Sequence, residues 1–116
     1  MVTYKELTEG INYFPVFAKR AIQPLVNYFG KEPELLPEIA QQLGGRKTEC
    51  GDVAVTVPAF PKAPVTLALW RGDAEFPPEG SLLFDSTISD YLTNDDIHAL
   101  CEIIVWKLVK LLKNRR

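Results

Sequence analysis

The chain has 116 residues, of which 47% are hydrophobic and 24% charged, and its formal net charge is −2. A fold of this length buries roughly two-thirds of the surface of its unfolded chain, which supports one core and not two. The 10% of aromatic residues and the low net charge exclude a disordered chain. The pI of about 5.4 offers no positive field to phosphate, so no nucleic-acid partner is expected. We therefore expect a single domain over residues 1–116.

The first third of the chain predicts two helices. Residues 1–13 are expected to form an extended or turn segment. Apolar residues then recur at three- and four-residue spacing and predict a helix over 14–30, with a kink or break at Pro24. Proline lacks the N–H that would bond to the carbonyl of Arg20. A second helix is predicted over 33–43.

The middle of the chain changes to the period of a strand. Alternating valines predict a half-buried strand over 53–57. Three prolines at three-residue spacing predict an extended connector over 57–64, because they exclude a helix. Further strands are predicted over 65–70 and 81–84, joined by a turn and a rigid loop over 71–80.

The last element has the clearest pattern. Residues 92–96 supply a helix cap and first-turn carboxylates, and an apolar stripe follows as far as about Lys113. The stripe is wider than one face, which is typical of a helix packed on more than one side. An exposed Trp106, flanked by Glu102 and Lys110, would suit a partner interface. The fold expected is α+β, with two N-terminal helices, a small mostly antiparallel sheet of about three strands, and the long C-terminal helix packed on it.

Charge is distributed unevenly along the chain. Residues 72–106 carry eight acidic residues and no Lys or Arg, whereas residues 107–116 carry five basic residues and no acid. The two segments could neutralise each other within the fold or across a dimer. The alternative is a solvated acidic edge together with basic residues that complement the end of a helix.

Nothing in the sequence predicts export or membrane insertion. The N-terminal residues lack a secretory signal, and no apolar run reaches the roughly 20 residues that cross a bilayer. Cys50 and Cys101 stand far apart and form no C-x-x-C motif, so reduced thiols in a cytoplasmic protein are expected. The only histidine, His98, is expected on a helix surface, where it shares the polar face of Glu102.

The most unusual segment supplies the candidate site. Asp73 and Glu75 lie two residues apart, so in an extended stretch both carboxylates would point the same way. If Asp85 lay nearby, the three could hold Mg²⁺ or Ca²⁺, or share a proton as acid and base. Trp70 and Phe76 complete a candidate ligand-binding or interaction surface. The structural alternative is a turn at Asp73, a core position for Phe76 and a capping role for Asp85.

Several blocks of sequence resemble one family. The blocks include Tyr4–Leu7, Phe17–Arg20, Leu43–Gly45, Leu69–Pro77, Leu83–Asp85 and Tyr91–Asp96, and the likeness extends over roughly residues 3–112. They are similar to the family catalogued as domain of unknown function 3786, found mainly in anaerobic bacteria and archaea. The resemblance implies a cytoplasmic protein near redox or one-carbon chemistry, and it carries over no catalytic residue.

The same resemblance suggests where the chain sits within a larger protein. Typical members begin with a further N-terminal stretch, so the chain is expected to be the C-terminal part of a longer family domain. Some members are joined to a four-cysteine iron–sulfur domain, and this sequence has no such cysteine set. No cofactor is therefore predicted for this chain.

Three hypotheses for function follow. The first is a non-catalytic accessory module that binds a protein partner or small ligand through the surface from Trp70 to Asp85. The second is a divalent-metal or carboxylate-dependent hydrolase that uses Asp73, Glu75 and Asp85. The third is a structural fragment whose apolar last helix packs on a missing N-terminal part of the domain or in a homodimer.

Overall fold

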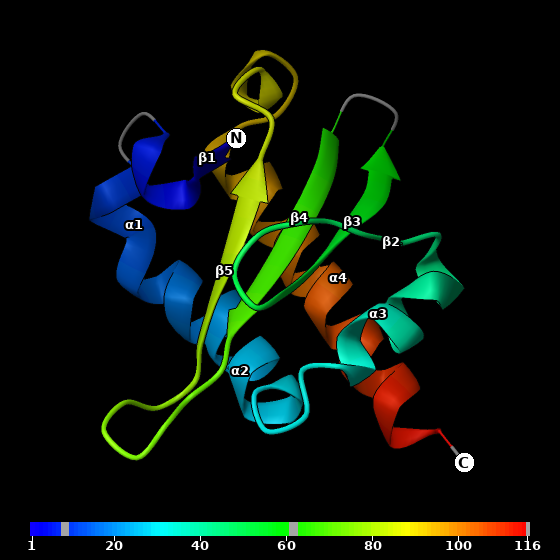
Figure 1. The fold of residues 1–116 in the computed structure, drawn as a ribbon. Helices are drawn as coiled ribbons and strands as arrows, with labels where there is room; N and C mark the ends of the chain where they lie inside the picture. Colours follow the sequence, from blue (N-terminus) through cyan, green and yellow to red (C-terminus); the bar gives the residue numbers. More distant parts are fainter. Residues whose placement is uncertain (8–9, 61–62, 116) are drawn as a thin grey trace.

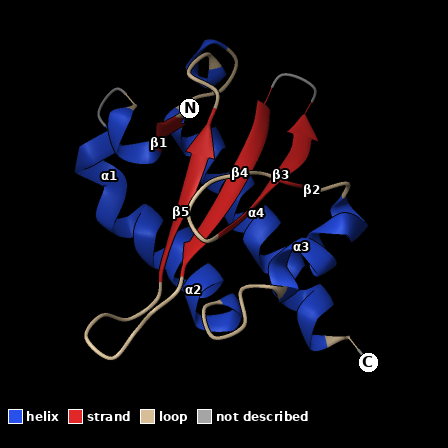
Figure 2. Ribbon diagram, in the orientation of Figure 1, coloured by secondary structure: helices blue, strands red, loops and turns tan. Residues whose placement is uncertain are grey.

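A computed structural model describes residues 1–7, 10–60 and 63–115, and it confirms the α+β class. The helices cover one side of an antiparallel sheet, while a single loop crosses the other side (Figure 1). The order of the strands in the described sheet is β1-β5-β4-β3-β2 (Figure 2). The strands are β1 (Val2–Thr3), β2 (Arg46–Lys47), β3 (Val53–Phe60), β4 (Ala63–Trp70) and β5 (Glu79–Phe84).

Four α-helices and several shorter turns connect these strands in the described chain. The α-helices are α1 (Gly10–Phe17), α2 (Gln23–Phe29), α3 (Leu35–Ala40) and α4 (Asn94–Lys113). A π-helical segment, η2 (Ala18–Ile22), joins α1 to α2. Three 3₁₀ turns complete the set: η1 (Tyr4–Glu6), η3 (Gln41–Leu43) and η4 (Ile88–Asp90).

The expectation of about three strands was too low, since the described sheet has five. The two additional strands, β1 and β2, are two residues long and extend the sheet at its edges. Two residues are too few to show an alternating pattern, so only the tertiary pairing reveals them. β1 pairs with the end of β5, and β2 pairs with the middle of β3.

The proline-rich segment is part of a β-hairpin and not only a connector. β3 continues through Pro58 to Phe60, and β4 begins at Ala63 before Pro64. Pro58 lies beyond the two β3 residues that pair with β2, and Pro64 lies within a shift of the β3–β4 register. Proline is tolerated at such positions because a regular ladder does not need its missing N–H. Pro61 lies outside the described residues.

The N-terminal helix begins earlier than predicted, at Gly10 within the segment expected to be extended. It also departs from α-helical geometry one turn before Pro24, in the π-helical segment η2. Pro24 then lies in the first turn of α2, directly after this segment. The interruption predicted at this proline is therefore a short π-helical segment.

The core lies between the helices and one face of the sheet. Alternate residues of the three long strands face the helices, and their partners across the ladder share that face. The residues buried here include Val55, Val65, Leu67, Leu69, Leu82 and Phe84 from the strands and Phe17, Leu25, Phe29, Leu36, Ile97, Cys101 and Leu108 from the helices. Burial of this one face fixes which side of β4 and β5 the helices occupy.

The C-terminal helix has the predicted cap. The Oγ1 of Thr93 accepts a hydrogen bond from the N–H of Asp96, and the Asp96 carboxylate accepts one from the N–H of Thr93. This reciprocal pair satisfies donors that the first turn of a helix leaves free. The outer side of α4 leaves Ile103 and Trp106 about half exposed.

The second face of the sheet is covered by the β2–β3 loop, residues 48–52. Small side chains occupy the middle of this face, where Ala54, Thr66 and Ala68 are buried beneath the covering segments. The hydroxyl of Thr56 bridges those of Thr48 and Thr66, with oxygen–oxygen distances of 2.6 and 2.8 Å. Each buried hydroxyl therefore has a partner, and the loop is held against the sheet.

The loop makes its closest approach to the sheet at Gly51, where φ is 60°. A Cβ there would lie 2.9 Å from both the Leu69 carbonyl oxygen and Trp70 Cε2. Gly44 has a similar φ of 77°, but a Cβ there would meet Pro58 at an ordinary 3.4 Å. Substitution of Gly44 would therefore introduce backbone strain alone, whereas substitution of Gly51 would introduce both backbone strain and steric overlap.

We expect Gly51→Ala to destabilise the fold more than Gly44→Ala does. Both substitutions place a side chain at positive φ, at a cost of about 1 kcal/mol each. Gly51→Ala adds an overlap that we expect to cost about 1–3 kcal/mol more. Urea unfolding followed by circular dichroism measures the two free energies of unfolding. Equal losses would show that the loop does not press on Trp70.

Candidate functional site

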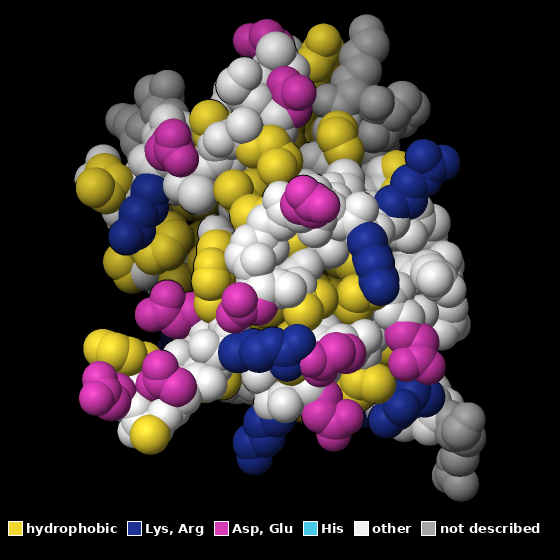
Figure 3. Space-filling view, viewed as in Figure 1, with side chains coloured by type: hydrophobic (Ala, Val, Ile, Leu, Met, Phe, Trp, Pro, Cys, Tyr) yellow, Lys and Arg dark blue, Asp and Glu magenta, His cyan; other side chains and the backbone are white. Residues whose placement is uncertain are grey.

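The candidate residues Asp73, Glu75 and Phe76 lie in the β4–β5 loop, which we call the hairpin tip (residues 71–78). The tip projects from the end of the sheet and is the lower-left loop in Figure 1. Figure 3 shows hydrophobic and acidic side chains side by side at this corner of the molecule. Trp70 is the last residue of β4 and stands at the base of the tip.

Asp73 builds the turn of the hairpin tip. Its Oδ1 accepts hydrogen bonds from the N–H groups of Glu75 and Phe76, both at 2.8 Å. The N–H of Asp73 in turn donates to the carbonyl of Phe76 at 2.8 Å. These bonds from Phe76 and Glu75 hold the pKa of the Asp73 carboxyl below its usual value. The expected extended stretch, with two carboxylates on one side, is therefore a closed turn that uses one carboxylate internally.

Arg71 ties the hairpin tip to two other elements. Its N–H donates to Oδ2 of Asp52 at 2.7 Å, while the N–H of Asp52 donates to the carbonyl of Leu69 at 2.9 Å. Its guanidinium pairs with the carboxylate of Glu34, directly before α3. The hydrogen bond from Arg71 lowers the pKa of the Glu34 carboxyl. These partners are far from Arg71 in sequence, and no local pattern could have identified them.

Pro78 packs the other end of the tip against the helical layer. A Cβ added to Gly30, at the end of α2, would lie 3.1 Å from the Cβ of Pro78. One added to Gly72 would lie 2.7 Å from the ring of Pro78, within the tip itself. The two glycines leave the room that this proline fills. The tip is therefore fixed at both of its ends and in its turn.

The two aromatic residues of the candidate site are exposed to different degrees. The ring of Trp70 lies against Gly51, and 37% of the residue is exposed. Phe76 is 64% exposed at the tip, so the alternative that placed it in the core is wrong. It forms no ring contact with another described aromatic residue. Phe76 is therefore the aromatic side chain that the tip presents to solvent.

Asp85 lies at the opposite end of β5 from the hairpin tip. Its Oδ1 accepts hydrogen bonds from the N–H and the hydroxyl of Thr87, at 3.0 and 2.7 Å, as in the capping role considered above. The six residues of β5 separate it from the tip, a distance of roughly 20 Å for an extended strand. Within the described ranges, no group of three His, Cys, Asp or Glu side chains could hold a metal ion. The structure therefore does not bring Asp73, Glu75 and Asp85 together.

The lowered pKa values of Asp73 and Asp85 also argue against a role for either carboxyl as a general acid. Hydrogen bonds from Thr87, first from its N–H and then from its hydroxyl, lower the pKa of Asp85, as those from Phe76 and Glu75 lower that of Asp73. A general acid that works at neutral pH needs a raised carboxyl pKa. Both aspartates are therefore structural acceptors at the ends of their turns.

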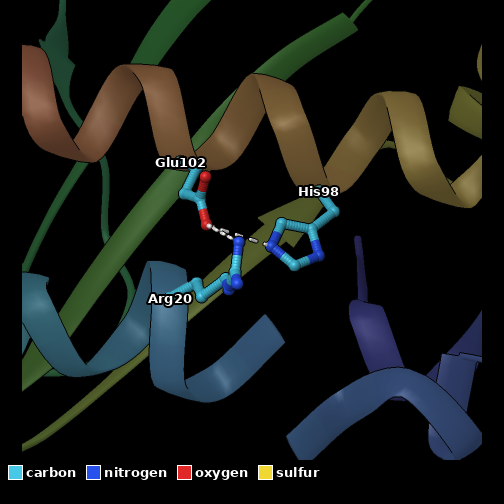
Figure 4. Close-up of polar contacts among 3 residues, drawn as sticks. All are labelled: Arg20, His98 and Glu102. Atoms are coloured by element: carbon cyan, nitrogen blue, oxygen red, sulfur yellow. Dashed lines mark hydrogen bonds and ion pairs between the residues drawn. The ribbon is translucent and has the colours of Figure 1, made fainter. Parts of the chain in front are cut away.

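His98 belongs to a second polar cluster, between α4 and the π-helical segment (Figure 4). Its Nε2 lies 3.4 Å from Oε1 of Glu102, with which it shares a helix face as expected, and Arg20 Nη1 lies 3.9 Å from the same oxygen. The ring also meets Tyr4 and Phe17 edge-on, and the side chain is only 19% exposed, so His98 lies between elements and not on the open helix surface that was expected. This cluster links two helices, and Arg20 is the member that sequence reasoning missed.

Both cysteines are free thiols, as expected. Cys101 is fully buried in the core, and burial raises the pKa of its thiol, so it stays protonated. Cys50 is half-buried in the loop that covers the sheet. None of the described helices has the length and apolar character needed to cross a bilayer.

Comparison with known proteins identifies one family. The profile described as Domain of unknown function (DUF3786) matches residues 1–107, which is most of the chain. No curated protein and no solved structure matches. The match supports the resemblance drawn from the sequence blocks, of which the Leu69–Pro77 block contains most of the hairpin tip.

We expect Asp73→Ala to loosen the hairpin tip, whereas Glu75→Ala leaves it closed. The first change removes the acceptor of two N–H groups, and the second removes an exposed carboxylate that makes no such bond. Hydrogen exchange followed by NMR should show faster exchange at the amides of residues 75 and 76 only in Asp73→Ala. Equal protection in both variants would contradict this assignment.

The same turn should open in acid. The folded pKa of Asp73 lies below its unfolded value. Its stabilisation is therefore complete above the usual aspartate pKa of about 3.9 and is lost as pH falls through the lower folded value.

Proposed function

We propose that this chain, which belongs to the family described as Domain of unknown function (DUF3786), has a non-catalytic accessory role and binds a protein partner through the hairpin tip. The observation that carries the proposal is the 64% exposure of Phe76 at the end of a loop that is fixed in one conformation. Large aromatic residues that become buried on association supply much of the binding energy of an interface.

The rigidity of the tip favours binding. Asp73 closes the turn, Arg71 bonds to Asp52 and Glu34, and Pro78 packs on Gly30. A loop that is already ordered loses little conformational entropy when a partner binds it. The free energy gained by burying Phe76 is then not offset by the cost of ordering its loop.

The charges around Phe76 suggest the chemistry of the partner. Asp73, Glu75 and Glu79 are all exposed, and Arg71, the basic residue of the tip, is paired with Glu34. An apolar pocket with a basic rim is complementary to this arrangement, because rim charges of opposite sign speed association and select the partner. We therefore propose a partner surface of that kind.

The proposed setting is the cytoplasm, in redox or one-carbon metabolism. The two free thiols fit a reducing compartment. The metabolic setting is taken from the sequence resemblance alone.

A photo-crosslinking amino acid at position 76 tests the proposal. We expect a discrete cross-linked product in extracts of the source organism, but none when the same group replaces Ile11, which is 68% exposed on α1. Excess unlabelled wild-type protein should compete, whereas Phe76→Ser should not. Phe76→Ser should change the free energy of unfolding by less than about 0.5 kcal/mol, because the side chain is largely exposed. The same products from positions 76 and 11, or none at all, would refute this role.

The outer side of α4 supports a second candidate function, association of two copies. Ile103 and Trp106 are 53% and 46% exposed, and the Trp106 ring meets Tyr28 edge-on at 6.1 Å. Exposed apolar side chains that lie together on one helix are typical of an interface. This is the surface on which the hypothesis of a homodimer through the last helix depends.

Sedimentation equilibrium tests this association. We expect concentration-dependent dimers of the wild-type chain, with Trp106→Glu weakening the dimer by about tenfold or more because it buries a charge at the interface. Phe76→Ser serves as the control and should leave the equilibrium unchanged. A wild-type chain that remains monomeric at millimolar concentration would exclude the dimer.

A further inference from the structure

One edge of the sheet is only half covered. β5 pairs along its length with β4, but on its other side β1 covers only Leu83 and Phe84. After Thr3 the chain leaves the sheet and enters the 3₁₀ turn η1. Within the described ranges, residues 79–82 of β5 therefore have a neighbouring strand on one side only.

The uncovered edge retains free hydrogen-bonding capacity. In an antiparallel ladder, alternate residues point their N–H and C=O groups to opposite sides of the strand. About half of the groups in residues 79–82 thus point away from β4. No backbone or side-chain hydrogen bond joins these four residues to a described residue outside the sheet. Such an edge is a template for one more strand.

A groove runs beside this edge. It is a hollow of about 720 Å³, between residues 77–80 on one side and the N-terminal helices on the other. A smaller hollow of about 210 Å³ continues it along residues 80–82 to Thr3. Figure 3 shows hydrophobic side chains gathered on its left side, over the N-terminal helices and beside β5. The apolar lining comes from Phe14, Ile22, Val26, Pro77 and Pro78.

We propose that this groove binds an extended peptide segment of a partner protein, which adds to the sheet as a strand beside residues 79–82. β1 already shows that the edge accepts an extended segment, because Val2 and Thr3 pair with the last two residues of β5. The added segment would continue the line of β1 over four residues. Recognition of this kind takes affinity from the backbone and specificity from alternate side chains.

The register of β5 specifies the side chains of that segment. Leu82 is buried toward the helices, and Gly80 shares its face, with Val26 of α2 directly beneath. Peptide residues opposite Leu82 and Gly80 would therefore face Phe14, Ile22 and Val26, where apolar side chains fit. The residues that alternate with them would face away from the helices and are expected to be polar.

The charges of the groove favour an acidic segment. Lys5 and Lys31 both line it, and the Nζ of Lys5 lies 4.4 Å from the centre of the Phe14 ring, at the apolar wall. Glu79 is the acidic residue of the described lining. A carboxylate near either end of the segment would thus meet a lysine. The predicted ligand alternates apolar and polar residues and carries Asp or Glu.

A second folded copy fits this edge less well than a single segment does. The edge lies between η1 and α1 on one side and Pro77 and Pro78 on the other. The β5 edge of a second copy carries the same surrounding elements, so pairing would bring these elements and the lysines of both copies against each other. A single extended chain has no such obstruction.

The first test needs no ligand. Hydrogen exchange followed by NMR should show that, among the amides of residues 79–82, those not bonded to β4 exchange freely in the wild-type chain. Full protection of all four amides would show that the edge is already satisfied, and the proposal would be overturned.

The second test uses random dodecapeptides displayed on phage and selected against the whole chain. We expect enriched peptides with alternating apolar residues and at least one Asp or Glu. Synthetic copies should bind the Lys5→Glu/Lys31→Glu variant about tenfold more weakly than wild type, since two ion pairs become repulsions. Lys107→Glu/Lys110→Glu, which changes two exposed lysines of α4, should bind as wild type does.

The bound peptide should also protect the free amides of residues 79–82 from exchange. No enrichment, equal binding to the two charge-reversed variants, or protection at other residues would each overturn the proposal. Self-association that Lys5→Glu/Lys31→Glu abolishes would assign the edge to a second copy and would also overturn it. Phe76→Ser should leave peptide binding intact, which separates this groove from the interface proposed at the hairpin tip.

Discussion

The structure depends on one constraint: the helices cover only one face of the sheet. That face carries large apolar side chains such as Leu67 and Phe84, whereas the middle of the other face carries small ones, Ala54, Thr66 and Ala68. A thin loop can cover small side chains, and a ladder of three threonine hydroxyls holds it there. The same loop supplies Asp52, whose N–H donates to the carbonyl of Leu69 and whose carboxylate accepts from the N–H of Arg71, on either side of the last residue of β4. The covering of the second face is thus also the foundation of the hairpin tip.

The hairpin tip contacts both the loop that covers the sheet and the helical layer, although it projects beyond both. Asp52 belongs to the covering loop, Glu34 to the start of α3 and Gly30 to the end of α2, and each contacts residues of the tip or its base. A hydrogen bond, an ion pair and a packing contact, each from a different element, hold a segment whose residues are mostly exposed. Such an arrangement does not stabilise a core, because Phe76 stays in solvent. It does preorganise a surface for binding, which is the physical reason for proposing a partner there.

Local patterns predicted those parts of the fold that local physics determines. The Thr93 cap, the helix that follows it and the alternation of Val53 to Val57 all appear where the sequence placed them. The strands β1 and β2 escaped prediction because two residues have no period, and their pairing is tertiary. The candidate site was likewise predicted only in part. Asp73 was identified as unusual, but whether it met Asp85 depended on β5 lying between them, which spacing in sequence cannot show.

The open half of the β5 edge also explains residues that the core does not need. An uncovered strand edge invites aggregation, and proteins guard such edges with lysine and proline. Lys5, Lys31, Pro77 and Pro78 surround this edge. These four residues hinder pairing with another folded sheet, because the prolines offer no N–H and the lysines repel the lysines of a second copy. They do not hinder an extended acidic segment, whose carboxylates the lysines attract. The features that protect the free chain are therefore those that would select its ligand.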